Sequence, residues 1–228
     1  MSTNRERTMR AGPGFYQRRV FPWLNDRFCG DEQLQELRAE ALRPAHGRVL
    51  EIGFGTGLNL PHYPAAVQSL VAVEPNAGMV GRARSRLAAA PMPVEIIAGG
   101  AEAIAAPAAS FDTAVSVLTL CTVGDPAQVL AELRRLLRPN GRLLLLEHGL
   151  APDAGVARWQ RRLNGLERVL ACGCTLDRPV AALVRAGGFG FESLRQFYAP
   201  GIPRTHGWLT LGCASLAAAA TGGSGRSR

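Results

Sequence analysis

Short aliphatic runs alternate along the chain with segments in which apolar residues recur at helical spacing. The last run is almost wholly apolar, which is expected of a strand that is covered on both faces. Alternating strands and helices predict a Rossmann-like, doubly wound α/β sheet whose strands are mostly parallel. The runs cover residues 48–52, 70–74, 94–97, 111–118 and 142–147, and helical segments between them cover 77–89 and 127–137.

Helical periodicity also precedes and follows this alternating core. Residues 15–28 and 31–42 form a predicted helical lead-in, which Pro22 and Gly30 interrupt. Turn residues between two late apolar runs predict an antiparallel C-terminal hairpin, which brings the sheet to seven strands. The late helices are predicted over 156–170 and 179–186, and the late strands over 191–198 and 207–215.

The length of 228 residues and the 47% hydrophobic content fit one domain with a single core. Glycine, serine, threonine and arginine dominate both ends of the chain, where no apolar periodicity is found. Residues 1–14 and 221–228 are therefore predicted to be mobile tails. Between them we expect a helical cover over 15–47 and one α/β domain over 48–220.

All 26 basic residues are arginine, and they outnumber 18 acidic residues to give a net charge of +8. An arginine-only set beside abundant Ala, Gly and Pro is what GC-biased coding produces. Selection for phosphate recognition is the alternative interpretation. Charge alone therefore identifies no partner.

The apolar runs are all shorter than the ~20 residues that a membrane-spanning helix needs. The arginine-rich residues 1–10 precede no apolar stretch of the kind found in secretory signals. We therefore expect a cytoplasmic protein without stable membrane insertion, and peripheral membrane contact stays open. The five cysteines form no CxxC pair, which predicts reduced thiols and no metal site.

A glycine-rich segment, VLEIGFGTG at residues 49–57, follows the first predicted strand and opens a turn. The dinucleotide fingerprint GxGxxG fails here, because the sixth position is Leu58 when counted from Gly53 and Leu60 when counted from Gly55. A P-loop needs a lysine, which this chain lacks. The pattern that remains is E-x-G-x-G-x-G.

Two carboxylates accompany this loop. Glu51 precedes it, where a carboxylate would repel a pyrophosphate and attract a cationic amine. Glu74 ends the second predicted strand, where it is positioned to accept both hydroxyls of a ribose. We therefore expect a zwitterionic or cationic ligand. S-adenosylmethionine has a ribose diol, an amino-acid tail and a sulfonium, and glycines would let the backbone approach it closely.

These residues resemble the sequence pattern of class I S-adenosylmethionine-dependent methyltransferases over about 48–147. The resemblance implies that residues 48–220 are the methyltransferase domain and that 15–47 cover a substrate. It assigns the glycines to the methionine part of the cofactor, Glu74 to its ribose, Ala101 and Glu102 to its adenine, and Val117 and Leu118 to the pocket beneath its sulfur. The candidate cofactor site comprises Glu51, Gly53, Gly55, Thr56, Gly57, Asn59, Glu74, Pro75, Ala101, Glu102, Val117 and Leu118.

Later motifs resemble the soluble bacterial relatives of animal alkyl-thiol methyltransferases. Quinone-biosynthesis and phospholipid methyltransferases are next nearest. The resemblance implies methyl transfer to a small hydrophobic acceptor, with thiol S-methylation favoured over quinol or phenol C- or O-methylation and phospholipid N-methylation. A non-catalytic binding module that kept the fold is the alternative of a different class. The motifs lie at 118–123, 136–141, 147–148, 159–160 and 173–178.

A thiol with a pKa of about 8.5 is partly ionised near neutrality, so its methylation needs little more than a pocket. His148, at the end of the fifth predicted strand, is the candidate catalytic base or substrate orienter, and a histidine bonded to backbone is the alternative. Cys121 and Cys174 are interpreted as pocket or core packing, because the methyl donor needs no nucleophile from the protein.

Nucleic-acid methyltransferases usually carry an Asn/Asp-Pro-Pro-Tyr/Phe motif after the fourth strand. Here the segment 118–121 reads LTLC, so a small-molecule substrate is expected and nucleic acid is not. The oligomeric state stays open. Arginines on the cover helices face either an anionic substrate or water, and they are Arg18, Arg19, Arg158, Arg161, Arg162 and Arg168.

Overall fold

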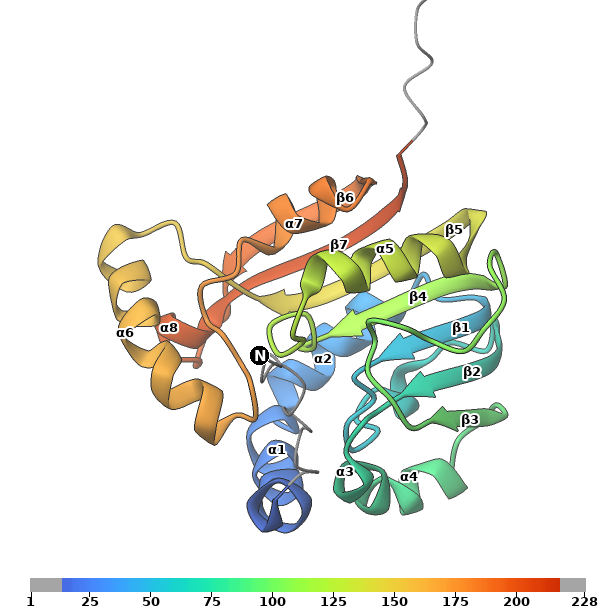
Figure 1. The fold of residues 1–228 in the computed structure, drawn as a ribbon, viewed down its shortest axis with the longest axis horizontal. Coiled ribbons are helices and arrows are strands. Elements are labelled where there is room, and N and C mark those ends of the chain that lie inside the picture. Colours follow the sequence, from blue (N-terminus) through green and yellow to red (C-terminus); the bar gives the residue numbers. More distant parts are fainter. Residues whose placement is uncertain (1–13, 218–228) are drawn as a thin grey trace, which may run out of the picture.

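The computed structural model describes residues 14–217, which form one seven-stranded sheet with helices on both faces (Figure 1). The strand order is β3-β2-β1-β4-β5-β7-β6. The strands are β1 (Gly47–Ile52), β2 (Val67–Val73), β3 (Val94–Ile97), β4 (Phe111–Val117), β5 (Leu137–His148), β6 (Phe189–Tyr198) and β7 (Trp208–Leu216).

The first five strands pair in parallel, whereas β7 is antiparallel to both β5 and β6. This arrangement confirms the predicted doubly wound sheet with a C-terminal antiparallel hairpin. β5 begins earlier than the predicted 142–147, because Leu137 already pairs with Phe111. The register then shifts before Arg142, and this irregularity accommodates the Pro139–Gly141 segment inside the strand.

The helices match most of the expected segments. They are α1 (Phe21–Cys29), α2 (Glu32–Leu42), α3 (Ala77–Arg82), α4 (Arg84–Ala88), α5 (Pro126–Leu136), α6 (Ala154–Leu170), α7 (Val180–Ala186) and α8 (Arg204–Gly207), with a π-helix η1 (Tyr16–Val20) and a 3-10 helix η2 (Leu60–His62). The single helix expected over 77–89 is two short helices, and the first contains Gly78 and Gly81, which weaken helix propensity.

Pro22 does not interrupt the lead-in as the sequence suggested. It lies in the first turn of α1, directly after the π-helix η1, so the helical segment changes from π to α at this point without breaking. Gly30 does separate α1 from α2, and the side chain of Asp31 caps α2 by accepting from the N–H of Gln33. Apart from Gly14, the predicted tails lie outside the described residues.

Two apolar layers hold the helices against the sheet. On one face, Leu50 and Ile52 pack with the buried side of α5, which includes Leu130 and Leu133. On the other face, Val49 packs in the cluster that contains Leu34 and Leu42 of α2. α5 and α7 therefore cover one face and α2 the other (Figure 1). Within residues 14–217, no helix combines the length and apolarity that crossing a membrane requires.

Candidate functional site

The candidate site lies at the carboxyl edge of the sheet, where the order reverses between β1 and β4. Ligands of open α/β sheets bind at such a switch point, because the loops that follow the two central strands diverge there. In Figure 1, α1 and α6 lie on the side toward which the arrows of β1, β2 and β4 point. Every predicted cofactor residue is on this edge or on the loops that leave it.

The glycine loop follows β1 and has three glycines with positive φ. Gly53 has φ 64°, and a Cβ at this position would meet the Thr119 side chain at 2.2 Å. Gly55 has φ 60°, but the nearest atom to a Cβ there would be 3.8 Å away, at the carbonyl oxygen of Gly53. Gly53 is therefore required for packing, whereas Gly55 keeps backbone open on a side that a ligand can approach.

Glu74 directly follows β2 and is 7% exposed. One carboxylate oxygen accepts the N–H of Gly55 at 2.8 Å, and the other accepts the N–H of Asn76 at 2.8 Å. Burial raises the pKa of Glu74, and the two backbone hydrogen bonds oppose that rise. Each oxygen still has a lone pair for another donor, as binding of a ribose diol requires. Pro75 follows on the exposed surface.

Glu51 is fully buried, and both its oxygens already have protein partners. It accepts from the Asn59 amide at 2.8 Å and from the Tyr63 hydroxyl at 2.7 Å. The Asn59 oxygen in turn accepts from Arg38 of α2 at 2.6 Å. Burial raises the pKa of Glu51 to about 7, although these hydrogen bonds and the charge of Arg38 lower it. Glu51 and Asn59 therefore join the loop to α2, and their contact with the cofactor stays a prediction.

The lead-in is attached to the glycine loop through Asp26 of α1. The Asp26 carboxylate accepts from the Thr56 hydroxyl at 2.5 Å and from Arg82 of α3 at 2.5 Å. Arg86 of α4 reaches both the same carboxylate and the carbonyl of Thr56, the latter at 3.0 Å. The buried Thr56 thus lies beneath α1. Sequence analysis missed Asp26, Arg38 and Tyr63, because their partners are distant along the chain.

The predicted adenine side follows β3. Ala101 is buried, and the half-buried Glu102 accepts from the N–H of Gly124 at 3.2 Å. A Cβ on Gly100 would lie 2.5 Å from an oxygen of the Glu102 carboxylate, so the side chain folds back over its own loop. Glu102 therefore links the segment after β3 to the turn after β4.

At the end of β4, Val117 is buried and Leu118 is half-buried with φ 52°. A leucine in this left-handed region costs about 1–2 kcal/mol, and such residues cluster at functional sites. The following turn is held by Glu147 of β5. One Glu147 oxygen accepts from the N–H groups of Thr119 and Leu120 at 2.8 and 3.0 Å, and from the Ser116 hydroxyl at 2.7 Å. Burial raises the pKa of Glu147, and these bonds oppose the rise.

The last residue of β5, His148, lies beside two cysteines from other segments. Its Nε2 is 3.1 Å from the sulfur of Cys174, and the ligand atoms of Cys121, His148 and Cys174 all lie within 4.8 Å of one another. A hydrogen bond with Cys121 lowers the pKa of Cys174 to about 5, helped by His148 and opposed by burial. The packing role expected for both cysteines is thus incomplete, because they also form a cluster with His148.

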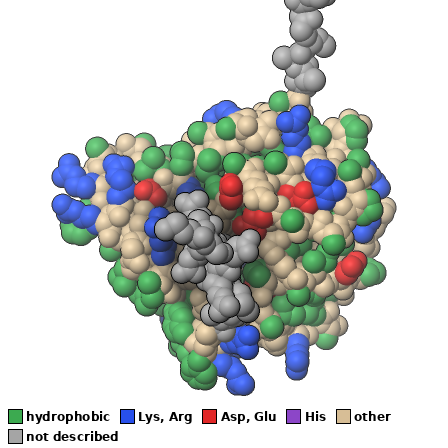
Figure 2. All heavy atoms as spheres, viewed as in Figure 1, with side chains coloured by type: hydrophobic (Ala, Val, Ile, Leu, Met, Phe, Trp, Pro, Cys, Tyr) green, Lys and Arg blue, Asp and Glu red, His purple; other side chains and the backbone are tan. Residues whose placement is uncertain are grey.

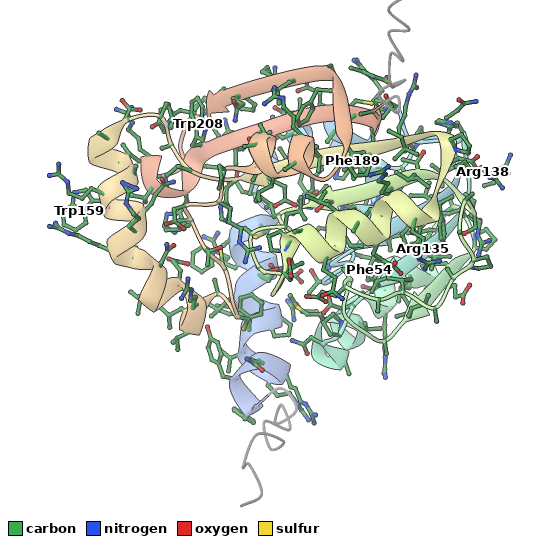
Figure 3. The ribbon with its side chains drawn as sticks, turned by 45° about the horizontal axis from the view of Figure 1, so that its top comes forward. Phe54, Arg135, Arg138, Trp159, Phe189 and Trp208 are labelled. Atoms are coloured by element: carbon green, nitrogen blue, oxygen red, sulfur yellow. The ribbon has the colours of Figure 1, made fainter. Side chains whose placement is uncertain are left out.

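The outer side of α6 is exposed. Arg158, Arg161, Arg162 and Arg168 face solvent, so on this helix the arginines point outward. Figure 3 shows Trp159 on the same outer side, directed away from the sheet, and the guanidinium of Arg162 lies 5.3 Å from the centre of its ring system. The described part of α6 therefore presents aromatic and cationic groups to its surroundings.

Comparison with known proteins gives a family match and relatives that align with part of the chain. Residues 50–145 match the family described as a methyltransferase domain. Thiol S-methyltransferase TMT1B of Rattus norvegicus is 34% identical over 134 residues, which are 57% of this chain and 54% of that protein. Phosphatidylethanolamine N-methyltransferase of Cereibacter sphaeroides is 31% identical over 126 residues, which are 54% of this chain and 62% of that protein. Each match thus spans less than two thirds of the relative's length.

The fold also has solved counterparts. A SAM-dependent methyltransferase from Thermotoga maritima superposes with a TM-score of 0.63 at 22% identity, covering 88% of this chain and 97% of that one. At this identity, the superposition shows that the two proteins share a fold. The family match, in contrast, rests on the sequence of residues 50–145. Residues 50–145 therefore match a methyltransferase domain, and they lie on a sheet with the fold of a SAM-dependent methyltransferase, with a glycine loop joined to a carboxylate at the switch point.

Proposed function

We propose that this protein transfers the methyl group of S-adenosylmethionine to a small hydrophobic thiol. The observation that carries the methyl-transfer part is the position of Glu74, whose carboxylate is bonded to the glycine loop at the switch point of the sheet. The thiol part is supported by the similarity to a thiol S-methyltransferase. It is further supported by the apolar end of β4.

The residues at the edge fit the methyl donor. Glu74 has one lone pair left on each oxygen for the two ribose hydroxyls, and Gly55 leaves backbone open beside it. Ala101 and Glu102 are assigned to the adenine side, and the remaining loop residues hold this arrangement in place. When bound, the donor supplies a methyl group on an activated sulfonium, so the protein needs chiefly to position the acceptor and exclude water.

The acceptor is proposed to lie between the ends of β4 and β5 and the cover formed by α1 and α6. Val117 and Leu118 supply an apolar wall there, which favours a hydrophobic acceptor and keeps water out. Orientation of the acceptor by His148 stays a prediction. A nucleic-acid substrate is not proposed, since the outward arginines of α6 share that surface with apolar side chains rather than lining a charged groove.

We also propose peripheral contact with an anionic lipid surface, which would suit a hydrophobic acceptor. Within residues 14–217, every large apolar side chain that is exposed lies on the lead-in or on α6. Figure 2 shows green side chains at the lower left of the molecule, over α1 and the lower part of α6, with blue side chains beside them. We call this the apolar–arginine surface; it comprises Phe15, Val20, Trp23, Phe28, Trp159, Leu166, Val169 and Leu170, with Arg18, Arg19, Arg27, Arg158, Arg161, Arg162 and Arg168 around them.

The two helical segments of this surface are joined, because the Tyr16 hydroxyl donates to the carbonyl of Leu170 at 2.7 Å. Aromatic and aliphatic groups ringed by arginine are the composition that binds membrane interfaces, where each basic residue contributes about 1 kcal/mol near anionic lipid. The same surface favours phospholipid N-methylation as the second candidate function, in line with the similarity to a phosphatidylethanolamine N-methyltransferase.

An acceptor panel with methyl-labelled donor tests the function directly. We expect an alkyl thiol such as hexanethiol to be methylated faster than the blank, and faster than a phenol or phosphatidylethanolamine in vesicles. Methylation of the phenol or the lipid amine without the thiol would overturn the thiol assignment. If S-adenosylhomocysteine binds and no acceptor in the panel reacts, the chain is a binding module that kept the fold.

A further inference from the structure

We propose that Cys121, His148 and Cys174 bind one zinc ion through three protein ligands and leave a fourth position for the sulfur of the acceptor. Among the common divalent ions, zinc is the one that two thiolates and one imidazole favour as ligands. Sites with three protein ligands keep an open position, whereas structural zinc sites use four. The occupant of that open position rests on the proposed function, but the metal site itself does not.

The spacing of the three ligand atoms fits one ion. Zn–S bonds of about 2.3 Å and Zn–N bonds of about 2.0 Å at tetrahedral angles separate the ligand atoms by about 3.5–3.8 Å. The ligand atoms of this cluster all lie within 4.8 Å of one another, and His148 Nε2 is 3.1 Å from the Cys174 sulfur. A tetrahedral site therefore needs shifts of less than about one ångström in side chains, and no rearrangement of the backbone.

The backbone around the cluster is fixed before any ion binds. Cys121 belongs to the turn that Glu147 holds through the N–H groups of Thr119 and Leu120. Cys174 lies on the loop after α6, and the next residue, Thr175, donates both its N–H and its hydroxyl to the Cys121 carbonyl at 2.9 Å. Three segments that are distant in sequence are thus tied together at the point where the ligands meet. Such a supporting frame is what holds metal ligands in a usable geometry.

Charge and access agree with a catalytic rather than a structural ion. Two thiolates would balance the charge of one divalent zinc, so a buried site would be neutral when loaded. Cys121 and Cys174 are buried, whereas His148 is half-buried, so the cluster is accessible on the histidine side. Among the described residues, the buried atoms His148 Nδ1 and Glu147 Oε2 have no hydrogen-bond partner, so polar groups of two adjacent residues at the cluster remain unused.

An open zinc position at this place selects for thiols. A thiol binds zinc as the thiolate and releases its proton to solvent, which makes the nucleophile available at neutral pH. Phenols and amines are weaker ligands for a zinc ion that already has two sulfur ligands. The preference for a thiol acceptor would therefore depend on the zinc ligands Cys121, His148 and Cys174 as well as on the shape of the pocket.

Metal content tests the site without any assay of methyl transfer. The full chain is stripped with a chelator, reloaded with zinc under a non-thiol reductant and analysed by elemental mass spectrometry. We expect about one zinc per chain, and at least a 100-fold loss of zinc affinity in each of C121S and C174S. C172S is the matched control, because Cys172 lies in the same loop and outside the cluster. Substoichiometric zinc in the reduced wild type, or equal losses in C172S, overturns the site.

Cobalt replacement tests the fourth position. Cobalt in a four-coordinate sulfur-containing site gives intense visible bands, and we expect these bands to shift when hexanethiol is added and to stay unchanged with a phenol. No shift with the thiol overturns the open position. Calorimetry with S-adenosylhomocysteine is run on the same metal-free protein. Normal cofactor binding and thiol methylation without metal would reject the role of the ion in acceptor binding and leave the proposed function standing. Normal zinc binding without any methyl transfer would leave the metal site standing and reject the proposed function.

Discussion

The carboxylate of Glu74 accepts the N–H of Gly55 at 2.8 Å, so the end of β2 and the glycine loop form one hydrogen-bonded unit. In E74Q, the amide can accept only on its oxygen, and its NH2 group opposes a backbone donor. Loss of a charged hydrogen bond costs about 1.5–3 kcal/mol, so we expect the affinity for S-adenosylhomocysteine to fall about 10- to 100-fold in calorimetry. E95Q, an exposed change on the neighbouring strand, is the control. Equal affinities would remove the ribose role of Glu74.

Gly55 offers a second test of the cofactor site. G55A places a methyl group where the nearest atom is 3.8 Å away, but at φ 60°. The strain should lower the free energy of unfolding by about 1–2 kcal/mol and leave the fold intact, while the methyl group obstructs the ligand. We expect cofactor affinity to fall far more than stability. Gly81 lies within α3 and has open space around it, so G81A should lower neither the cofactor affinity nor the stability. Full affinity in G55A would place the ligand elsewhere.

Asp26 joins the lead-in to the glycine loop through Thr56 and Arg82. In D26A, these bonds are lost and two arginines are left without a partner carboxylate, so we expect unfolding to become easier by about 1–2 kcal/mol. Limited proteolysis should cut the lead-in earlier than in the wild type. E40A removes the exposed pair with Arg195 and should cost less than about 1 kcal/mol. Identical digestion patterns for D26A and wild type would contradict this role of Asp26.

Burial of Glu51 predicts a pH dependence of stability. Its pKa is about 7 in the folded chain, against 4.5 for an ordinary glutamate. Because the folded state holds this proton more tightly, the contribution of Glu51 to stability is full below pH 4.5 and declines as the pH rises toward 7. The decline amounts to about 3 kcal/mol. In urea unfolding, the stability difference between pH 4.5 and 8 should be smaller by about this amount in E51Q. An unchanged difference would show that the pKa of Glu51 is not raised.

The apolar–arginine surface should bind lipid vesicles. Burial of one Trp side chain is worth about 2 kcal/mol, so W159A is expected to weaken sedimentation with vesicles of phosphatidylcholine and phosphatidylglycerol at least severalfold. Added salt should weaken binding further, because arginines contribute through charge. R195A changes an exposed arginine on β6 and serves as the control. Equal binding to neutral and anionic vesicles, or none, would contradict the proposed lipid contact.

The spacing of apolar residues predicted the order and type of the main elements, because each strand and each helix has apolar residues at the positions that it buries. The glycine motif and the end of the second predicted strand indicated where the loop and Glu74 lie, since each directly follows a strand, and the cofactor roles of these residues stay predictions. Sequence analysis did not predict the network of Glu51, Asn59 and Arg38, because the spacing of α2 relative to the loop is set by packing across the sheet. The positive φ of Leu118 likewise has no sequence signal, since leucine rarely adopts it.

The cysteine cluster escaped sequence analysis for a related reason. Cys121 and His148 become neighbours only because β4 and β5 are adjacent in the sheet, and Cys174 joins them only through the loop after α6. No local spacing such as CxxC marks the three residues. The predicted doubly wound sheet was the signal that could have brought Cys121 and His148 together, because it places the turn after the fourth strand and the end of the fifth strand at the same edge.

The position of β7 between β5 and β6 has a consequence for assembly. Although β6 precedes β7 in the chain, within the described sheet it is attached only through β7. During synthesis, β5 and β6 must therefore wait with open edges until residues 208–216 have emerged and inserted between them. Loss of that one segment would also detach β6, so the sheet depends on the part of it that is made last.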